Sequence, residues 1–172
     1  MGRTHSRSKV KLIIGFIFKH NSDFELALRL LSRRFGKVDF DSLGIAFVHT
    51  DYYKDEFGDN LKKRFVSFKR LILPAKLPQI KLITNSIESK FSKAGKRCVN
   101  IDPGYLDSAK LVLATTKDFV HRIYLSKGIY AEVTLYYKDK TFNSWPWTYP
   151  DYRTVEYIGI FNRIRSLYLS QL

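Results

Sequence analysis

The segment from Arg122 to Tyr136 constrains the fold more than any other stretch, because apolar and polar side chains alternate along it on both sides of Ser126-Lys127-Gly128. A period of two is typical of β-strands with one covered face, and the glycine suits the left-handed position of a three-residue hairpin loop. The expected register pairs Arg122 with Glu132, Ile123 with Ala131, Tyr124 with Tyr130 and Leu125 with Ile129. We therefore expect an antiparallel hairpin with an apolar inner face and a solvated outer face that carries Arg122, Tyr124, Tyr130, Glu132, Thr134 and Tyr136.

The sequence before the hairpin predicts two helices separated by short strands. Residues 22–25 have the form of a capping box, and apolar residues then recur at helical spacing until Gly36 ends the helix. Pro78 opens a second helix, and Gly95 lies just beyond its apolar stripe. The predicted strands are residues 11–18, 43–48, 65–73, 96–102 and 111–115, with Asp102-Pro103-Gly104 as a turn.

The first four strands and two helices follow one another in the order of a ferredoxin-like βαββαβ fold. We therefore predict an α+β protein with a ferredoxin-like βαββαβ core and an antiparallel sheet, extended by the C-terminal β-hairpin and helix. The proline-rich residues 145–152 are expected to form a loop, and apolar spacing from Tyr157 to Tyr168 predicts the last helix. An α/β fold with a parallel sheet is the alternative.

Length and composition indicate one soluble domain. The chain has 172 residues, 45% of them hydrophobic, which fits a single domain (1–172) with its own core; residues 1–9 are expected to form a flexible basic N-terminus. No apolar run approaches the ~20 residues of a membrane span, so no membrane partner is expected. The single cysteine, Cys98, fits a reducing cytoplasm.

Basic residues dominate the charge of the chain. Thirty Lys and Arg residues against sixteen Asp and Glu residues give a net charge of +14. Between Leu61 and Ile101, eleven Lys or Arg residues are accompanied by one acidic residue, Glu88. A basic face attracts phosphate groups, so we expect a phosphate-bearing partner, either a nucleotide or RNA. A generally basic surface without a dedicated site is the alternative.

Several short motifs carry candidate chemistry. Phe65-Val66-Ser67-Phe68 matches part of the RNA-recognition motif, whose aromatic rings stack on bases, although such rings are more often core residues. Residues 145–153 hold both tryptophans, whose rings either cap the core or form a wall against a ligand. His121 is a candidate acid–base group. No ligand spacing typical of a metal site is present, so no metal is predicted, and the phosphate loop of common NTPases is absent.

Seven segments, KLIIGFI, FVHTDYY, IKLITNSIE, VNIDPGYL, KLVLATTKDFVHRIYL, GIYAEVTLYY and WPWTYPDYR, occur in this order over nearly the whole chain. Together they resemble the domain-of-unknown-function 4416 family of bacterial proteins. The resemblance implies no activity, cofactor or catalytic residue. It does draw attention to polar and aromatic residues in these segments: Asn100, Asp102, Tyr105, Thr115, Lys117, His121, Arg122, Tyr130, Glu132, Trp147, Asp151 and Arg153.

Three functional hypotheses follow. The first is a cytoplasmic protein that binds a phosphate-bearing ligand, nucleotide or RNA, through a basic, aromatic sheet face made of Arg97, Asn100, Lys117, Arg122, Tyr124, Tyr130, Trp147 and Arg153. The second is an enzyme that acts on an anionic small molecule, with acid–base candidates His121, Glu132, Asp102 and Asp151. The third is a protein-interaction module with a basic surface. A concave site would favour a small ligand, and an open basic sheet would favour RNA.

Overall fold

β1 (Lys11–Phe18) is the strand around which the sheet is built. All eight of its residues are buried, as expected of an apolar strand covered on both faces. It pairs with β4 (Lys62–Phe68) on one side and β5 (Val99–Leu106) on the other. The computed structural model describes residues 8–47, 59–92 and 95–172, and in these the protein is a mixed α and β fold with a nine-stranded antiparallel sheet and three α-helices.

The strands are arranged in the order β2-β4-β1-β5-β6-β8-β7, with β3 beside β4 and β9 beside β8. All paired strands in the described residues are antiparallel, so the parallel-sheet alternative is wrong. The strands flanking the centre are β2 (Val38–Asp41), β3 (Ile45–Ala46), β6 (Lys110–Thr115), β7 (Arg122–Ser126), β8 (Ile129–Lys138) and β9 (Thr141–Ser144).

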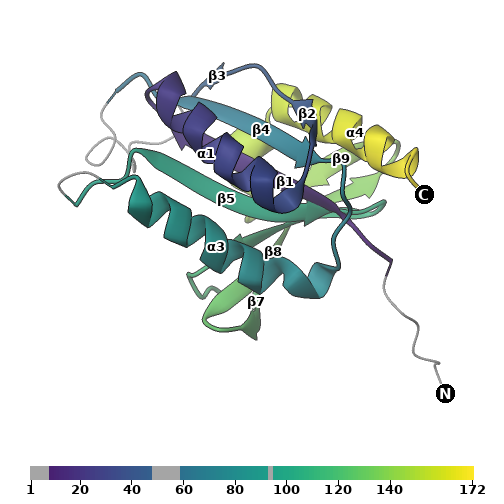
Figure 1. The fold of residues 1–172 in the computed structure, drawn as a ribbon. Helices are drawn as coiled ribbons and strands as arrows, with labels where there is room; N and C mark the ends of the chain where they lie inside the picture. Colours follow the sequence, from purple (N-terminus) through teal and green to yellow (C-terminus); the bar gives the residue numbers. More distant parts are fainter. Residues whose placement is uncertain (1–7, 48–58, 93–94) are drawn as a thin grey trace.

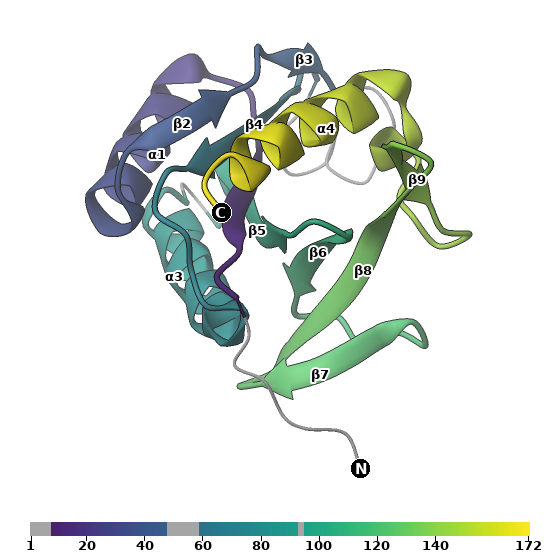
Figure 2. The same cartoon turned by 90° about the vertical axis from the view of Figure 1, so that its right-hand side faces the viewer.

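The helices form a layer on each side of the sheet. α1 (Asn21–Phe35) and α3 (Leu77–Lys90) pack on one face, and α4 (Val155–Leu169) packs on the other (Figure 1, Figure 2). The core beneath α1 and α3 takes alternate β1 side chains: Leu12, Ile14, Phe16 and Phe18. The core beneath α4 contains Ile13, Phe65, Tyr157, Phe161 and Ile164. Ile17, on the same β1 face as Ile13, belongs instead to a small cluster with Phe47 and Leu61, so α4 covers only part of its face.

The start of α1 differs from the prediction, whereas its end agrees. The helix begins at Asn21 directly after β1, and its N-cap residue His20 makes no side-chain capping bond, so the predicted capping box is wrong. At the other end Gly36 has φ 97° and donates its N–H to Ser32 O, which is the helix stop that the sequence predicted. α3 and α4 are confirmed in type and approximate position.

Asp102-Pro103-Gly104 was predicted as a turn and is instead part of β5, so that prediction is wrong. Pairing of all three residues with β1 outweighs the local turn preference of Pro-Gly. Pro103 lies opposite Ile14 of β1, and the pairing of β5 with β6 starts one residue later at Gly104. A Cβ at Gly104 would come within 2.4 Å of Val112 O, so the glycine allows β6 to approach.

The early strands also differ from the prediction. Of the predicted residues 43–48, only Ile45–Ala46 form a strand, and Val48 lies outside the described residues. The strand predicted at residues 65–73 begins and ends earlier, as β4 at Lys62–Phe68, and β2 and β9 were not predicted. Short strands carry few alternating residues, so the sequence signal for them is weak. The expected flexible N-terminus falls mostly on residues 1–7, which are outside the described residues.

The β7–β8 hairpin confirms the pairing of Arg122 with Glu132, Ile123 with Ala131 and Tyr124 with Tyr130. Beyond these pairs the register shifts, and Ser126 instead of Leu125 pairs with Ile129. The prediction of a three-residue loop is therefore wrong. Lys127 and Gly128 form a two-residue turn in which both have positive φ, 54° and 72°, as a type I′ hairpin requires.

The predicted exposure of the two hairpin faces is wrong at four positions, whereas Ile129 and Leu135 are buried and Tyr124 is exposed, as predicted. Glu132 and Thr134, assigned to the solvated face, are 2% and 0% exposed, whereas Ile123 is 68% exposed and Leu125 39%. The part of the polar face around Thr134 is covered by the segment before α4, residues 145–154, which we name the Trp-Pro loop. Its Thr148 hydroxyl donates to Thr134 O at 2.6 Å. A covered polar face is stable only if its polar groups find partners, and these partners form the candidate site.

Candidate functional site

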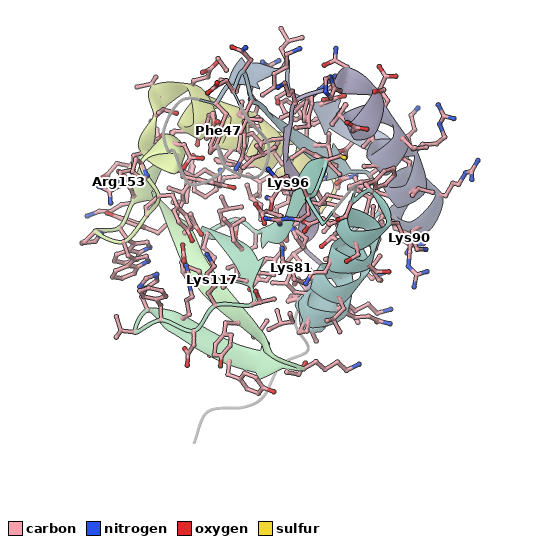
Figure 3. The ribbon with its side chains drawn as sticks, turned by 90° about the vertical axis from the view of Figure 1, so that its left-hand side faces the viewer. Phe47, Lys81, Lys90, Lys96, Lys117 and Arg153 are labelled. Atoms are coloured by element: carbon pink, nitrogen blue, oxygen red, sulfur yellow. The ribbon has the colours of Figure 1, made fainter. Side chains whose placement is uncertain are left out.

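A cavity of about 460 Å³ lies on the sheet face that α4 covers only in part. Figure 3 views the molecule from one end of the sheet, between the two helix layers: Phe47, Lys81 and Lys117 lie around the middle of the view, whereas Arg153 and Lys90 lie toward its left and right sides. Side chains of β4, β1, β5, β6 and β8 contribute to the cavity, and the Trp-Pro loop forms one wall. The lining residues are Ile17, Phe47, Lys63, Lys81, Arg97, Asn100, Asp102, Leu113, Ala114, Thr115, Thr116, Lys117, Arg122, Glu132, Tyr149, Pro150, Asp151 and Tyr152.

Charged side chains dominate the polar part of this lining. The five cations are Lys63, Lys81, Arg97, Lys117 and Arg122, and the three carboxylates are Asp102, Glu132 and Asp151. They come from β4, α3, the approach to β5, the loop after β6, and later segments, so only folding brings them together. Charges interact more strongly away from bulk water, and an excess of cations in a concave site attracts anions.

Lys81 and Asp102 form the centre of a hydrogen-bonded chain across the cavity floor. Lys81 Nζ lies 3.2 Å from Asp102 Oδ1 and 3.3 Å from Ile101 O. Asn100 donates its amide N–H to Asp102 Oδ2 at 2.5 Å, and its amide oxygen accepts from Arg97 at 2.8 Å. The floor is therefore rigidly organised before any ligand binds.

Glu88 anchors the end of this chain below the cavity. Its Oε2 accepts from Arg97 at 3.0 Å. Burial raises the pKa of Glu88, and the charge of Lys81 and the Arg97 hydrogen bond offset this only in part. Burial also opposes ionisation of Asp102, but the charges of Lys81 and Lys63 outweigh it, so the pKa of Asp102 lies below its ordinary value. Asp102 is thus an ionised acceptor at neutral pH.

Glu132 is held by three neighbours at the β8 side of the cavity. Its Oε2 accepts from Arg122 Nε at 2.9 Å and lies 3.2 Å from His121 Nε2. Its Oε1 accepts from the Thr134 hydroxyl at 3.1 Å. The predicted Arg122–Glu132 pair is present and buried, with the two side chains 5% and 2% exposed. With its oxygens engaged in this way, Glu132 acts as a fixed structural acceptor.

Arg122 connects the hairpin to two neighbouring loops. Beyond its bond to Glu132, the guanidinium donates to Lys117 O at 3.0 Å and to the Tyr149 hydroxyl at 2.8 Å. Burial raises the pKa of Tyr149, so its hydroxyl remains protonated at neutral pH. Arg122 therefore sets the distance between the loop after β6 and the Trp-Pro loop, which are two sides of the cavity mouth.

Lys63 and Asp151 form a second buried ion pair at the β4 side of the cavity. Lys63 Nζ lies 3.7 Å from Asp151 Oδ2, and the side chains are 4% and 9% exposed. This separation exceeds the length of a hydrogen bond. Three aromatic rings surround the ammonium group, with centroids 5.4 Å (Phe47), 5.6 Å (Phe65) and 5.2 Å (Tyr152) away. All three centroids lie within the ~6 Å at which an aromatic ring attracts a cation.

The tryptophans belong to a row of stacked rings outside the cavity lining. Trp145 and Trp147 are nearly parallel with centroids 5.1 Å apart, and Trp147 stacks on His121 at 5.4 Å. Arg153 stabilises the Trp-Pro loop by donating hydrogen bonds to two of its carbonyl oxygens, Thr148 O and Pro146 O, at 2.7 Å each. These residues shape the Trp-Pro loop, and His121, which stacks on Trp147, also contacts Glu132.

The structure brings together eight of the residues singled out in the sequence: Arg97, Asn100, Asp102, Thr115, Lys117, Arg122, Glu132 and Asp151. Six others do not line the cavity: Tyr105, His121, Tyr124, Tyr130, Trp147 and Arg153. Tyr124 and Tyr130 form an edge-to-face pair at 5.4 Å on the hairpin. The RNA-motif aromatics Phe65 and Phe68 are fully buried in two different cores, so a base-stacking role for them is wrong.

Lys63, Lys81 and Tyr149 are cavity residues that the sequence did not single out. The sequence does contain a pattern that places the two lysines on buried faces. Lys63 lies two residues from Phe65 in β4, on the same strand face, and Lys81 lies on the α3 stripe that also carries the buried Leu77 and Thr84. A lysine on a buried face needs a partner, which marks it as a candidate. No comparable pattern points to Tyr149.

The described residues contain no cluster of three or more His, Cys, Asp or Glu side chains arranged to hold a metal ion. None of the helices found in them is long and apolar enough to cross a membrane. A family model described as a domain of unknown function (DUF4416) matches residues 8–168. No curated protein and no solved structure gives a significant match to the chain.

Proposed function

The chain belongs to the DUF4416 family, and we propose that it binds a small phosphate-bearing ligand, such as a nucleotide, in the cavity beside the Trp-Pro loop. The observation that carries the proposal is the convergence of five cationic side chains on one concave site. The volume of about 460 Å³ is within the range of small-molecule sites.

The arrangement of charges suits a phosphorylated ligand that also has hydroxyl groups. Lys81, Arg97 and Lys117 are cationic residues of the cavity lining. Asp102 is ionised and is held in place by Lys81 and Asn100. A fixed carboxylate accepts hydrogen bonds from sugar hydroxyls, while the cations balance the charge of a phosphate.

A small ligand is favoured over RNA because the cations point into a concave site. The aromatic residues expected to stack on bases, Phe65 and Phe68, are buried. Acid–base catalysis is less favoured because His121 does not line the cavity and stacks on Trp147. We retain a cytoplasmic location as part of the proposal, supported by the single cysteine, Cys98.

We also propose that β2, β4, β1 and β5 form a ferredoxin-like core. The support is their adjacency in this order, the antiparallel pairing of each neighbour, and the position of α1 and α3 on one face. The strands β6 to β9 would then be an extension that supplies the second half of the cavity.

The proposal is tested first by identifying what co-purifies with the protein. The full chain is purified without nuclease treatment, washed at low and high salt, denatured, and the extract is analysed by absorbance and mass spectrometry. A discrete nucleotide or sugar phosphate that resists the salt wash is the expected result. Heterogeneous RNA that salt removes would contradict the small-ligand proposal. If the protein purifies without a ligand, it is titrated with nucleotides. Absence of binding in that titration would contradict the small-ligand proposal.

Two lysines of α3 offer a matched pair of variants. Lys81 lines the cavity, whereas Lys90 is exposed in the last turn of the same helix (Figure 3). Lys81→Gln is expected to weaken binding of the identified ligand about tenfold, as loss of one charge-assisted contact does. Lys90→Gln should bind like the wild type. Equal affinities for the two variants would place the ligand elsewhere.

A further inference from the structure

The Lys63–Asp151 pair has hydrogen-bonding capacity that the described residues do not use. The two charged groups are 3.7 Å apart, and neither makes a side-chain hydrogen bond to any described residue. Lysine has three N–H donors and a carboxylate has two acceptor oxygens. Buried polar groups normally find partners, so this end of the cavity is suited to a group that accepts from Lys63 and donates to Asp151.

The charge of the pair argues against a phosphate at this position. Lys63 and Asp151 together are neutral, and the Asp151 carboxylate repels an anion placed against Lys63. In the rest of the lining, cations outnumber carboxylates, with Lys81, Arg97, Lys117 and Arg122 against Asp102 and Glu132. A neutral polar group therefore fits the Lys63 end of the cavity, and a phosphate fits the end that carries the excess.

Aromatic rings define the shape of the group that fits there. The ring centroids of Phe47 and Tyr152 lie 5.4 and 5.2 Å from Lys63 Nζ, and both residues line the cavity. Flat aromatic walls favour a planar ring, which packs against them in stacked or edge-on contact. A group that fits this end of the cavity is therefore planar and uncharged, and it donates and accepts hydrogen bonds at neighbouring atoms.

The separation of the two ends sets the length of the ligand. Lys63 is in β4, whereas Thr115 ends β6 and Lys117 follows it, and β1 and β5 lie between these strands. Three strand spacings correspond to about 14 Å along the sheet. A ligand that reaches both ends is elongated, with a planar ring at one end and a phosphate at the other.

We propose that Lys63 and Asp151 recognise the hydrogen-bonding edge of a heterocyclic base, with Lys63 donating to a ring or carbonyl acceptor and Asp151 accepting from an adjacent N–H. The proposal rests on the function proposed above and assigns the specificity of that site to the base. It requires no reaction, because the pair holds the base and the cations near Lys81 hold the phosphate.

The test compares ligands that differ only in the base. Binding of AMP, GMP, CMP, UMP and ribose 5-phosphate to the full chain is measured by calorimetry at one salt concentration. At least one nucleotide is expected to bind tenfold or more tightly than ribose 5-phosphate. If ribose 5-phosphate binds as tightly as every nucleotide, base recognition is wrong while phosphate binding stands. If none of the five binds, the proposed nucleotide site fails as well.

The assignment to this pair is tested with Lys63→Met and Asp151→Asn. Each is expected to remove most of the preference for the nucleotide and to leave the affinity for ribose 5-phosphate within about threefold, because the phosphate contacts lie elsewhere. Lys62→Met is the matched control, since Lys62 is the adjacent, exposed residue. Chemical denaturation shows that each variant is folded. A preference that survives both substitutions would overturn the assignment.

Discussion

Lys11 and Lys63 are two buried lysines on one face of the sheet, and they differ in how completely the protein itself satisfies them. Ile17 of β1 pairs directly with Lys63 of β4, and Lys11 lies six residues before Ile17 on the same strand face. Lys11 is near the C-terminal end of α4, and Lys63 is near the loop that leads into its N-terminal end. The same face therefore carries one lysine at each end of the helix that covers it.

The ammonium group of Lys11 is fully used by the protein. It donates to Asp39 at 2.6 Å, to Phe68 O at 3.4 Å and to the side-chain oxygen of Gln171. Lys63 has an ion pair at 3.7 Å and three aromatic neighbours, makes no side-chain hydrogen bond to the described residues, and lines a cavity. Burial alone does not distinguish the two lysines. The unused hydrogen-bonding capacity of Lys63 beside a cavity is what supports its proposed role in ligand binding.

Lys11→Met should have the largest effect on stability. It removes the ion-pair partner of Asp39 and the hydrogen bond to Gln171, so we expect the free energy of unfolding to fall by about 3 kcal/mol. Urea denaturation measures this loss. Nucleotide binding at a temperature where the variant is folded should match the wild type. A variant as stable as the wild type would mean that the Lys11 contacts contribute little.

Arg122→Ala should rank second, because Arg122 is also satisfied by protein groups. The substitution removes hydrogen bonds to Glu132, Lys117 O and Tyr149, and we expect a loss of about 2 kcal/mol in unfolding free energy. Arg33→Ala, at an exposed position in α1, should change stability by less than about 0.5 kcal/mol. Similar losses in the two variants would remove the structural role assigned to Arg122.

Lys63→Met should lower the free energy of unfolding less than Lys11→Met does, and it should lower nucleotide affinity more. We expect a fall of about 1 kcal/mol in unfolding free energy, since no hydrogen bond to the described residues is lost and cavity water can solvate Asp151. Nucleotide affinity should fall about tenfold. Thermal or urea denaturation together with calorimetry separates the two effects. If Lys63→Met instead loses stability like Lys11→Met and keeps full affinity, the contrast between the two lysines is wrong.

Asp102→Asn should have the smallest effect, and the effect should depend on pH. The pKa of Asp102 is lowered in the folded protein, so its ionisation stabilises the fold above the unfolded-state pKa of about 3.9, and this stability is lost as pH falls through the folded-state pKa. At pH 7 we expect Asp102→Asn to lose about 1 kcal/mol. The difference from the wild type should shrink below about pH 4. Unfolding free energies measured from pH 3 to 7 check this, and a constant difference would contradict it.

Local patterns in the sequence determined the elements whose signal is contained in consecutive residues. The apolar run of β1, the helical spacing of α1, α3 and α4, and the pairing of Arg122 with Glu132 all follow from periodicity. The sequence also brought attention to eight of the lining residues, mainly in β5 and the β6–β8 region. Local signals were misleading where strand pairing decided the outcome, as at Asp102-Pro103-Gly104 in β5.

Only the tertiary structure decided which polar residues are buried and which of them meet. Glu132 and Thr134 alternate like solvated residues, but the Trp-Pro loop closes over them and supplies their partners. Lys63 and Asp151 are far apart in the sequence and share no motif, so no local pattern could pair them. Burial depends on which distant segment covers a strand face, and that choice is made by the packing of the whole chain.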